Sequence, residues 1–379
     1  MIVTIIIFII VLAALIFVHE LGHFIAARSF GIRVDEFALG FGPRLFSWKV
    51  KGGGFWGETT YAVNAIPFGG FVKIFGENPD EESIGGPDRQ RSFVNASRWK
   101  QAVVLVAGVF GNFIFAWLLV TFALTIGTAA SPADYPQYAD RMSYDRITID
   151  SVSSASPADN AGLKEGDVIA GLSAGVVPAR QRMTVEAIQG DIASSSGSIL
   201  IFSILRDGKH IFINTKAATG TIADDPNRFA IGIAMEETAT LQLPVYLAAY
   251  ESIRFNYYLV KEVYGVLGSL FQGQVSVSDL AGPVYIAQKT GEAAQSGFSS
   301  LLVFVGLISV NLGVMNLLPI PALDGGRLLF VIIEAIRRKP IKPSIANGIN
   351  LTGFVLLMLL MVFVTYHDIV RTVMQYYQH

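Results

Sequence analysis

Four long apolar runs constrain the fold of this chain more than any other feature of its sequence. The first carries no charge before His19, and the others cover about residues 101–126, 298–318 and 351–366. A helix needs roughly 20 apolar residues to cross a bilayer, and the first run reaches that length if its helix continues through His23. A content of 52% hydrophobic and 15% charged residues is unusual for a soluble protein. The sequence predicts a polytopic α-helical membrane protein with four transmembrane helices.

The first apolar run ends in His19-Glu20-Leu21-Gly22-His23. On a helix the two histidines project from one face, one turn apart, so their imidazoles can bind one zinc ion. Glu20 stands beside the first histidine and is placed to act as a general base toward a zinc-bound water. Ionisable groups inside a membrane segment are costly and indicate function by default. Because the chain has no cysteine, any metal site must use His, Asp or Glu.

A third ligand is predicted at the end of the third apolar run, because two histidines leave a catalytic zinc short of one protein ligand. Asp324 follows Pro319-Ile320-Pro321 and precedes two glycines, so on its own it would be interpreted as a turn residue. At the same membrane depth as His19 and His23, the ligand role becomes the stronger interpretation. Asn316, eight residues earlier, is predicted to hydrogen-bond the backbone of an extended substrate.

Basic residues predict the orientation. They gather in the connection after the first run, from Arg28 to Lys100, and in the connection before the fourth, from Arg327 to Lys342. Positive charge beside membrane segments marks the cytoplasmic side, so both termini and the middle domain are expected outside. The first run lacks a basic start and a cleavage site, so we expect it to be retained as a span. A net charge of −2 favours no nucleic-acid partner.

Between the first two spans, the chain from Ile32 to Glu77 is rich in glycine, aromatic and β-branched residues, a pattern typical of short strands joined by glycine turns. We interpret it as a membrane-associated β-rich loop that covers the metal site and pairs with an extended substrate by strand addition. The alternative is an ordinary hairpin linker. Within the second span, close helix packing accounts for Gly108 and Asn112, and Asn112 needs a partner away from lipid. A direct role of Asn112 in the site is the less favoured alternative.

The stretch from Ser156 to Ile169 resembles the PDZ-domain element S-P-A-x-x-A-G-L-x-x-G-D-x-I. The resemblance implies an inserted PDZ-like α+β domain with a groove for a chain end or a strand. The following segment has scattered aromatic and charged residues, which favours an amphipathic helix on the membrane surface. The expected segments are 1–27 (first span), 28–100 (β-rich loop), 101–127 (second span), 128–237 (PDZ-like domain), 238–297 (surface segment), 298–319 (third span), 320–349 (aspartate motif and loop), 350–367 (fourth span) and 368–379 (tail).

These motifs in this order resemble the site-2 protease family, and most closely its bacterial RseP-like branch, with a single PDZ domain here. The resemblance implies a zinc intramembrane protease in the bacterial cytoplasmic membrane, with His19, His23 and Asp324 as Zn2+ ligands and Glu20 as catalytic base. It also places Asn316 near the substrate, and Gly69 and Gly70 in a membrane-associated hairpin. Family substrates are single-span proteins already trimmed by another protease, often anti-sigma factors, and some members clear remnant signal peptides.

Two other functions fit an intramembrane metal site. A metal-binding adaptor of the same architecture would have no use for a base, so the intact Glu20 argues against it. A metal transporter also uses intramembrane histidines, but transporters more often repeat their motifs in two internal halves, and no such repeat is visible in the sequence.

Overall fold

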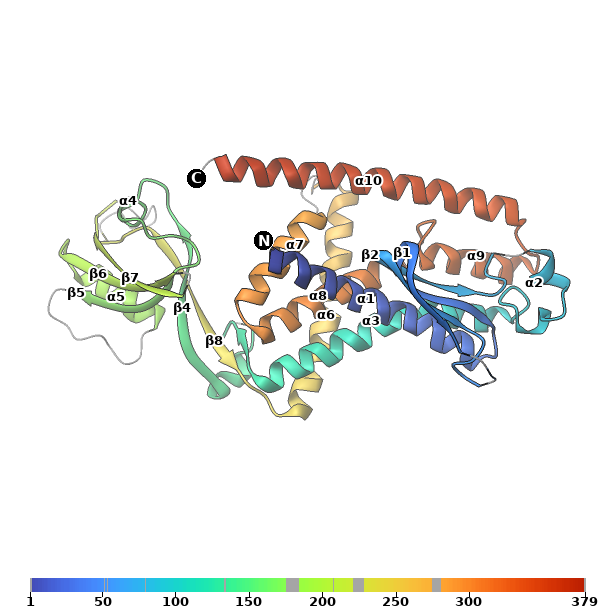
Figure 1. Cartoon of the computed structure of the whole chain (residues 1–379). Helices are drawn as coiled ribbons and strands as arrows, with labels where there is room; N and C mark the ends of the chain where they lie inside the picture. Colours follow the sequence, from blue (N-terminus) through green and yellow to red (C-terminus); the bar gives the residue numbers. More distant parts are fainter. Residues whose placement is uncertain are drawn as a thin grey trace. The chain divides into compact units, whose positions relative to one another are not determined.

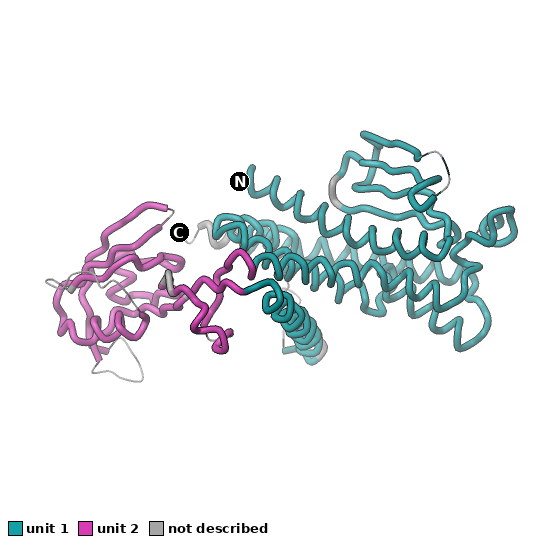
Figure 2. Tube along the Cα trace, turned by 90° about the horizontal axis from the view of Figure 1, so that it is seen from below, with its two compact units in different colours: residues 1–123, 244–379 teal, residues 124–243 magenta. Residues whose placement is uncertain are grey.

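The structure is a computed structural model that describes residues 2–50, 52, 54–78, 80–132, 134–174, 184–206, 208–220, 228–274 and 281–377. Within these ranges four helices are long and apolar enough to cross a membrane, which confirms the predicted polytopic architecture. They are α1 (Ile2–Ser29), α3 (Arg98–Ile126), α8 (Phe298–Leu317) and α10 (Pro343–Tyr377) (Figure 1). The chain divides into two compact units, residues 1–123 with 244–379, and residues 124–243 (Figure 2).

The β-rich loop of the first unit forms the two long strands β1 (Val34–Lys49) and β2 (Thr60–Ile74). Each strand bends back on itself, so residues 34–39 pair with 70–74 on one side and with 60–63 on the other, while 60–64 also pair with 44–49. The hairpin is therefore four strands wide. It packs on α1 through an apolar core that includes Phe24, Phe37 and Val72. The edge at 44–49 exposes large apolar side chains, among them Phe46 and Trp48.

Four further α-helices belong to the first unit: the long helix α6 (Val245–Phe271) and the shorter helices α2 (Glu81–Gly85), α7 (Pro283–Gln295) and α9 (Asp324–Arg337). Figure 1 shows α6 running across the direction that α1, α3 and α10 share. It is held to α3 by Trp117, whose indole N–H donates to the Ala249 carbonyl at 2.9 Å, and by Asn256, whose amide donates to the Phe113 carbonyl at 3.1 Å. Several of its tyrosines are exposed, and tyrosine is enriched at membrane–water interfaces. The location of α6 on the membrane surface stays a prediction.

The second unit is a six-stranded antiparallel sheet in the order β3-β8-β4-β5-β6-β7, with two helices. Its elements are β3 (Thr128–Ala130), β4 (Met142–Val152), α4 (Pro157–Ala161), β5 (Val168–Ala174), α5 (Val185–Ser194), β6 (Ile199–Arg206), β7 (Lys209–Lys216) and β8 (Ile233–Leu241). Side chains from four strands and both helices form one apolar core around Phe202 and Ile188. The Leu243 amide donates to the Leu124 carbonyl at 2.8 Å, so the ends of the unit meet.

The motif from Ser156 to Ile169 owes its residue pattern to local folding. The Ser156 hydroxyl caps α4 by accepting from the Asp159 amide, and Gly162 ends the helix in the left-handed region at φ 85°. Asp167 is 1% exposed and binds Arg206 through two hydrogen bonds of 2.7 Å, which ties the motif to β6. The identity of this unit as a PDZ domain stays a prediction.

Several expected boundaries differ from the structure. The region 320–349 is not simply a loop, because Asp324 begins the 14-residue helix α9. The fourth span is not confined to 350–367, because α10 begins at Pro343 and continues to Tyr377, so the expected tail is mostly helical. Strand β8 extends to Leu241, beyond the expected end of the middle domain at residue 237. The remaining spans differ from the expected ranges by one to three residues.

Candidate metal centre

Glycines let helices α1 and α3 approach closely enough to build a site between them. A Cβ on Gly22 would lie 2.2 Å from the Ala107 carbonyl oxygen, and a Cβ on Gly108 would lie 2.3 Å from His23 Nε2. A larger residue at either position would push the helices apart or displace the imidazole. The small residue at position 108, predicted from the sequence to serve helix packing, therefore also makes room for His23.

Three side chains that could hold a metal ion converge at this contact. His19 and His23 from α1 place their Nε2 atoms 3.2 Å apart, and Asp324 Oδ2 lies 3.0 Å from the first and 3.3 Å from the second. Both histidines are less than 10% exposed. Despite these short distances, Asp324 Oδ2 is buried and makes no hydrogen bond of acceptable geometry with any residue that the structure describes. The structure thus brings together the three residues predicted as ligands.

This arrangement fits zinc. Ligand atoms at about 2.0–2.1 Å from a tetrahedral ion are separated by roughly 3.3 Å, close to the three distances between these atoms. Two imidazoles and one carboxylate are the ligand set of catalytic zinc sites, which keep a fourth position open. A buried carboxylate oxygen with no hydrogen bond is costly unless a cation neutralises it. The donor set and its spacing therefore suit one Zn2+.

The Asp324 carboxylate is positioned by the first turn of α9 and the loop before it. A Cβ on Gly325 would lie 2.2 Å from the Leu317 and Leu318 carbonyl oxygens, so only glycine permits this close return of the chain. Two ion pairs hold α9 from the other side. Arg327 pairs with Glu77, and Glu334 pairs with Arg98 of α3 at 2.7 Å.

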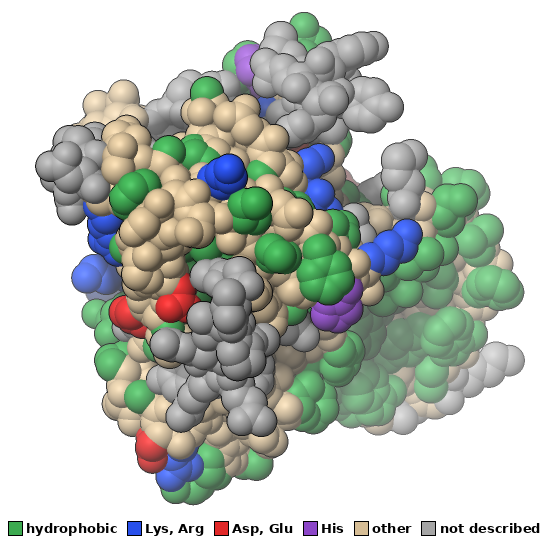
Figure 3. Space-filling model, turned by 90° about the vertical axis from the view of Figure 1, so that its left-hand side faces the viewer, with side chains coloured by type: hydrophobic (Ala, Val, Ile, Leu, Met, Phe, Trp, Pro, Cys, Tyr) green, Lys and Arg blue, Asp and Glu red, His purple; other side chains and the backbone are tan. Residues whose placement is uncertain are grey.

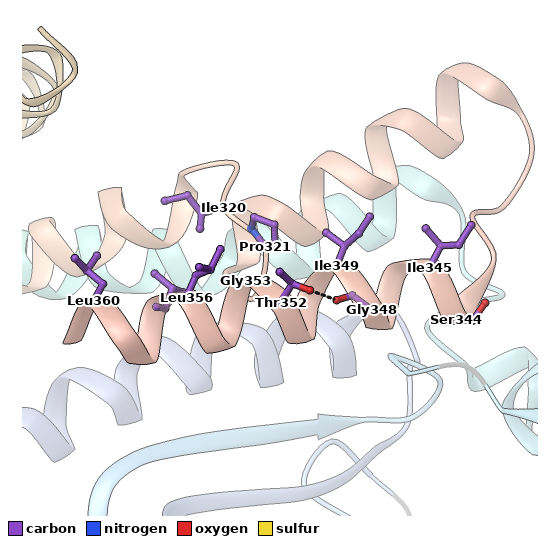
Figure 4. Close-up of a pocket in the computed structure, with 11 residues that line it drawn as sticks. Ile320, Pro321, Ser344, Ile345, Gly348, Ile349, Thr352, Gly353, Leu356 and Leu360 are labelled. Atoms are coloured by element: carbon purple, nitrogen blue, oxygen red, sulfur yellow. Dashed lines mark hydrogen bonds between the residues drawn. The ribbon is translucent and has the colours of Figure 1, made fainter. Parts of the chain in front are cut away.

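Helix α10 supports the same loop. The Asn350 side chain accepts a hydrogen bond from the backbone amide of Ala322, which has a positive φ of 76°. Gly353 lies against Pro321, where a Cβ would come within 2.5 Å of the proline ring (Figure 4). Beside this contact, Ile320 and Pro321 and one face of α10 line an apolar cavity of about 520 Å³. Contacts with α10 therefore restrain the loop that presents Asp324.

Helix α3 places a polar group beside the Nδ1 atom of each histidine. His23 Nδ1 lies 2.8 Å from the Val104 carbonyl oxygen, which can only accept, so His23 carries its proton on Nδ1 and leaves Nε2 free for a metal. His19 Nδ1 lies 3.2 Å from the side-chain amide of Asn112, which is fully buried. Neither contact was predicted from the sequence. The available signal for Asn112 was a polar residue within an apolar span, which needs a partner away from lipid.

Glu20 follows His19 on α1 and faces the hairpin. A Cβ on Gly70 would lie 3.6 Å from Glu20 Cγ, and the Glu20 carboxylate has a backbone hydrogen bond from Val72. Strand β2 therefore passes the carboxylate at contact distance. Burial lowers the pKa of the Arg327 guanidinium, and the negative charge of Glu20 opposes that shift. Arg327 was not predicted as a site residue, and its place three residues after Asp324 was the available signal.

The predicted substrate-binding residues lie around this centre without forming one cluster. Gly70 is beside Glu20, whereas Gly69 lies against the Phe41 ring, where a Cβ would come within 2.0 Å of a ring carbon. Asn316 is half-buried in the last turn of α8. Among the residues that the structure describes, no partner hydrogen-bonds to the Asn316 side chain.

Nearly the whole chain matches known zinc metalloproteases. The model of peptidase family M50 matches residues 7–360. A Nostoc sp. protein named "Putative zinc metalloprotease" is 37% identical over 365 residues, which is 93% of this chain and 92% of that protein. A Clostridium perfringens protein that bears the same description is 35% identical, covering 94% and 96%. The zinc metalloprotease RasP of Geobacillus kaustophilus is 30% identical, covering 97% of each chain.

Proposed function

This chain belongs to peptidase family M50, and on that basis we propose that it cuts peptide bonds within the membrane-spanning segments of single-span proteins that another protease has already trimmed. It is a zinc metalloprotease, and the family, that of the site-2 proteases, acts in general by intramembrane proteolysis. The proposed substrates are regulators that resemble anti-sigma factors and remnant signal peptides, which makes the reaction a step of regulated intramembrane proteolysis.

The observation that carries the proposal is the convergence of Asp324, at the start of α9, with His19 and His23 on α1, a helix long enough to span a bilayer. Glu20 follows His19 on the same helix. A group of this kind inside the membrane is costly and indicates a functional site. The three side chains are the proposed zinc ligands. When bound, zinc supplies a Lewis acid that polarises the scissile carbonyl and makes water a stronger nucleophile.

Glu20 is the proposed general base. It accepts a proton from the water as the oxygen attacks the carbonyl carbon, and it returns that proton to the amide nitrogen as the C–N bond breaks. The products are a carboxylate and an amine. The hydrogen bond from the Val72 backbone and the contact with Gly70 hold the carboxylate on the hairpin side of α1.

A helical substrate must unwind before its peptide bond can be attacked, and unwound backbone in lipid needs new hydrogen-bond partners. The segment 70–74 pairs with 34–39 on one side, and no other described strand pairs with its outer side. We propose that the substrate adds as a strand to this edge, near Gly69 and Gly70. The amide of Asn316, which has no partner in the described part of the chain, is the proposed second contact.

The protein is a multi-pass membrane protein, and we place it in the bacterial cytoplasmic membrane with both termini and the second unit outside. The basic connections support this orientation. The second unit is proposed to be a PDZ-like domain that binds a peptide. Its antiparallel sheet, its two helices and the capped motif at Ser156 support that identity.

The test compares the purified wild type with Glu20→Gln on a truncated single-span protein in detergent or vesicles. Loss of the general base should lower the cleavage rate by at least about 10²-fold while the zinc content stays at one ion per chain. The matched control is Glu292→Gln, which changes an exposed glutamate on α7 and should cleave like the wild type. Equal cleavage by wild type and Glu20→Gln would remove Glu20 from the mechanism. A zinc-loaded wild type that cuts none of several such substrates would favour a binding protein.

A further inference from the structure

Asn112 is a polar side chain beside the metal centre that neither the ligand set nor the proposed mechanism uses. It is 0% exposed in the middle of α3, and its Nδ2 lies 3.2 Å from His19 Nδ1. Its Oδ1 is buried and has no hydrogen-bond partner among the described residues. A buried amide oxygen left in this way costs free energy, so its placement calls for an explanation.

The chemistry of His19 decides which atom of the amide should face it. His19 directs Nε2 toward Asp324 and His23, so a metal binds at Nε2 and a neutral imidazole carries its proton on Nδ1. An Nδ1–H opposite an amide N–H sets two donors against each other. The oxygen and nitrogen of an asparagine amide are assigned from the hydrogen-bond network, not from their shape. Rotating the amide by a half turn gives Oδ1 a donor and gives Nδ1–H an acceptor.

The same relation exists already at the other histidine. His23 Nδ1 donates to the Val104 carbonyl on the same helix, α3, two turns before Asn112. Helices α1 and α3 are antiparallel here, so the order of the contacts is reversed: His19 lies against Asn112, and His23 against the earlier Val104. One acceptor belongs to the backbone and is present whatever the residue. The other depends on the side chain at position 112.

We propose that Asn112 is a positioning residue for the metal centre: its Oδ1 accepts the Nδ1 proton of His19 and holds that imidazole in the tautomer and orientation that bind zinc through Nε2. Such partners of metal-binding histidines raise metal affinity, and their loss typically costs 10- to 100-fold. The inference rests on the proposed ligand set, so its test includes a separate check of that set.

The experiment measures zinc retention by the full-length protein in detergent against increasing concentrations of a chelator. Asn112→Leu, of similar size and without an acceptor, should lose zinc at 10- to 100-fold lower chelator concentration than the wild type. Asn112→Asp keeps an acceptor oxygen and has no donor, so it should hold zinc at least as well as the wild type. Asn112→Ala repeats the loss with a smaller side chain in case the leucine variant aggregates.

The control is Ser309→Ala. The Ser309 hydroxyl, on α8, donates to the Asn112 backbone carbonyl at 2.8 Å. This variant therefore disturbs the packing around Asn112 without touching its side-chain amide, and its zinc affinity should match the wild type. Wild-type affinity in Asn112→Leu or in Asn112→Ala would overturn the proposal. So would an Asn112→Asp variant as weak as Asn112→Leu, because the atom that faces His19 would then be the donor. A wild type that binds no zinc would instead overturn the ligand set.

Discussion

Two aspartates in different units are withdrawn from water in very different ways. In the second unit the Asp167 side chain is 1% exposed, binds Arg206 twice at 2.7 Å and accepts from the Lys164 amide at 2.9 Å. In the first unit the Asp324 side chain is 20% exposed, and its buried Oδ2 has no hydrogen bond to a described residue although two imidazole nitrogens lie within 3.3 Å. The fold supplies hydrogen-bond donors to the Asp167 carboxylate and supplies no described donor to Asp324 Oδ2.

The difference indicates that Asp167 stabilises the fold, whereas Asp324 Oδ2 is free to bind a ligand. A buried carboxylate with a full set of donors is part of the packing of its unit. One without donors is explained by a cation that the protein is built to receive. In Figure 3 the near face shows scattered charged and hydrophobic side chains among tan atoms, whereas the faint distant part is mostly green hydrophobic side chains.

The largest expected effect follows from removing the Asp324 carboxylate, whose Oδ2 has no described hydrogen-bond donor. Asp324→Ala takes one of three predicted ligands from the ion, so zinc affinity should fall by at least about 10²-fold and proteolysis should be lost. Elemental analysis after dialysis measures the first and cleavage of a single-span substrate the second. Asp324 belongs to the first unit, and no described hydrogen bond depends on its Oδ2. The resistance of the second unit, segment 124–243, to pulse proteolysis in urea should therefore not change. An unchanged zinc stoichiometry would remove Asp324 from the site.

The sequence predicted the three residues of the candidate metal site because their signals are local. The spacing of His19 and His23 is a property of one helix, and Asp324 stands out as an acid at the end of an apolar run. The partners of the histidines depend on how α1 and α3 pack, which no local pattern contains. Which carbonyl of α3 meets His23 follows from the approach that Gly22 and Gly108 allow.

The missed helix ends have a similar origin. The fourth span was expected at 350–367 because the last apolar run ends at Tyr366. In the structure Asp368 is buried and accepts a hydrogen bond from the Tyr285 amide at the start of α7, so a charge that normally ends a span is used inside a helix contact. The two glycines after Asp324 predicted a turn, but they permit close packing at the start of α9 instead.

The second prediction concerns the contribution of the hydrogen-bonded Asp167 carboxylate to the stability of the second unit. Asp167→Ala removes the carboxylate that the Arg206 guanidinium and the Lys164 amide bind, and breaking a buried ion pair in this way costs about 3–5 kcal/mol. Because Arg206 is 25% exposed, water offsets part of that cost, and we expect about 2–3 kcal/mol. Pulse proteolysis of the intact protein in urea measures it. Zinc content should stay at one ion per chain, and a loss of zinc would show that the two aspartates are not independent.

The third prediction concerns the space that Gly108 leaves for the His23 imidazole at the candidate metal site. Gly108→Ala would normally favour a helix by up to about 1 kcal/mol. Here its Cβ would lie 2.3–2.8 Å from three atoms of the His23 imidazole, so the ring must move. We expect zinc affinity to fall by about 10-fold in a chelator competition. Gly265→Ala is the matched control, because that helical glycine has nothing within 4 Å, and it should leave zinc affinity unchanged. Equal affinities in both variants would mean that α3 shifts to accommodate the methyl group.

The smallest expected effect concerns a glycine of the second unit that serves backbone conformation and not space. Gly162 ends α4 at φ 85°, and no described atom lies within 4 Å of the position that an alanine methyl group would take. Gly162→Ala therefore meets no neighbour and bears only the strain of the left-handed region, about 1 kcal/mol. Gly162→Asn should cost less, because asparagine tolerates that region. Urea-dependent proteolysis of segment 124–243 separates the two, while zinc content and cleavage rate stay at wild-type values. A neutral Gly162→Ala would show that the end of α4 relaxes out of the left-handed region. A loss of more than about 2 kcal/mol would exceed that strain, so the position would then be restricted by contacts as Gly108 is.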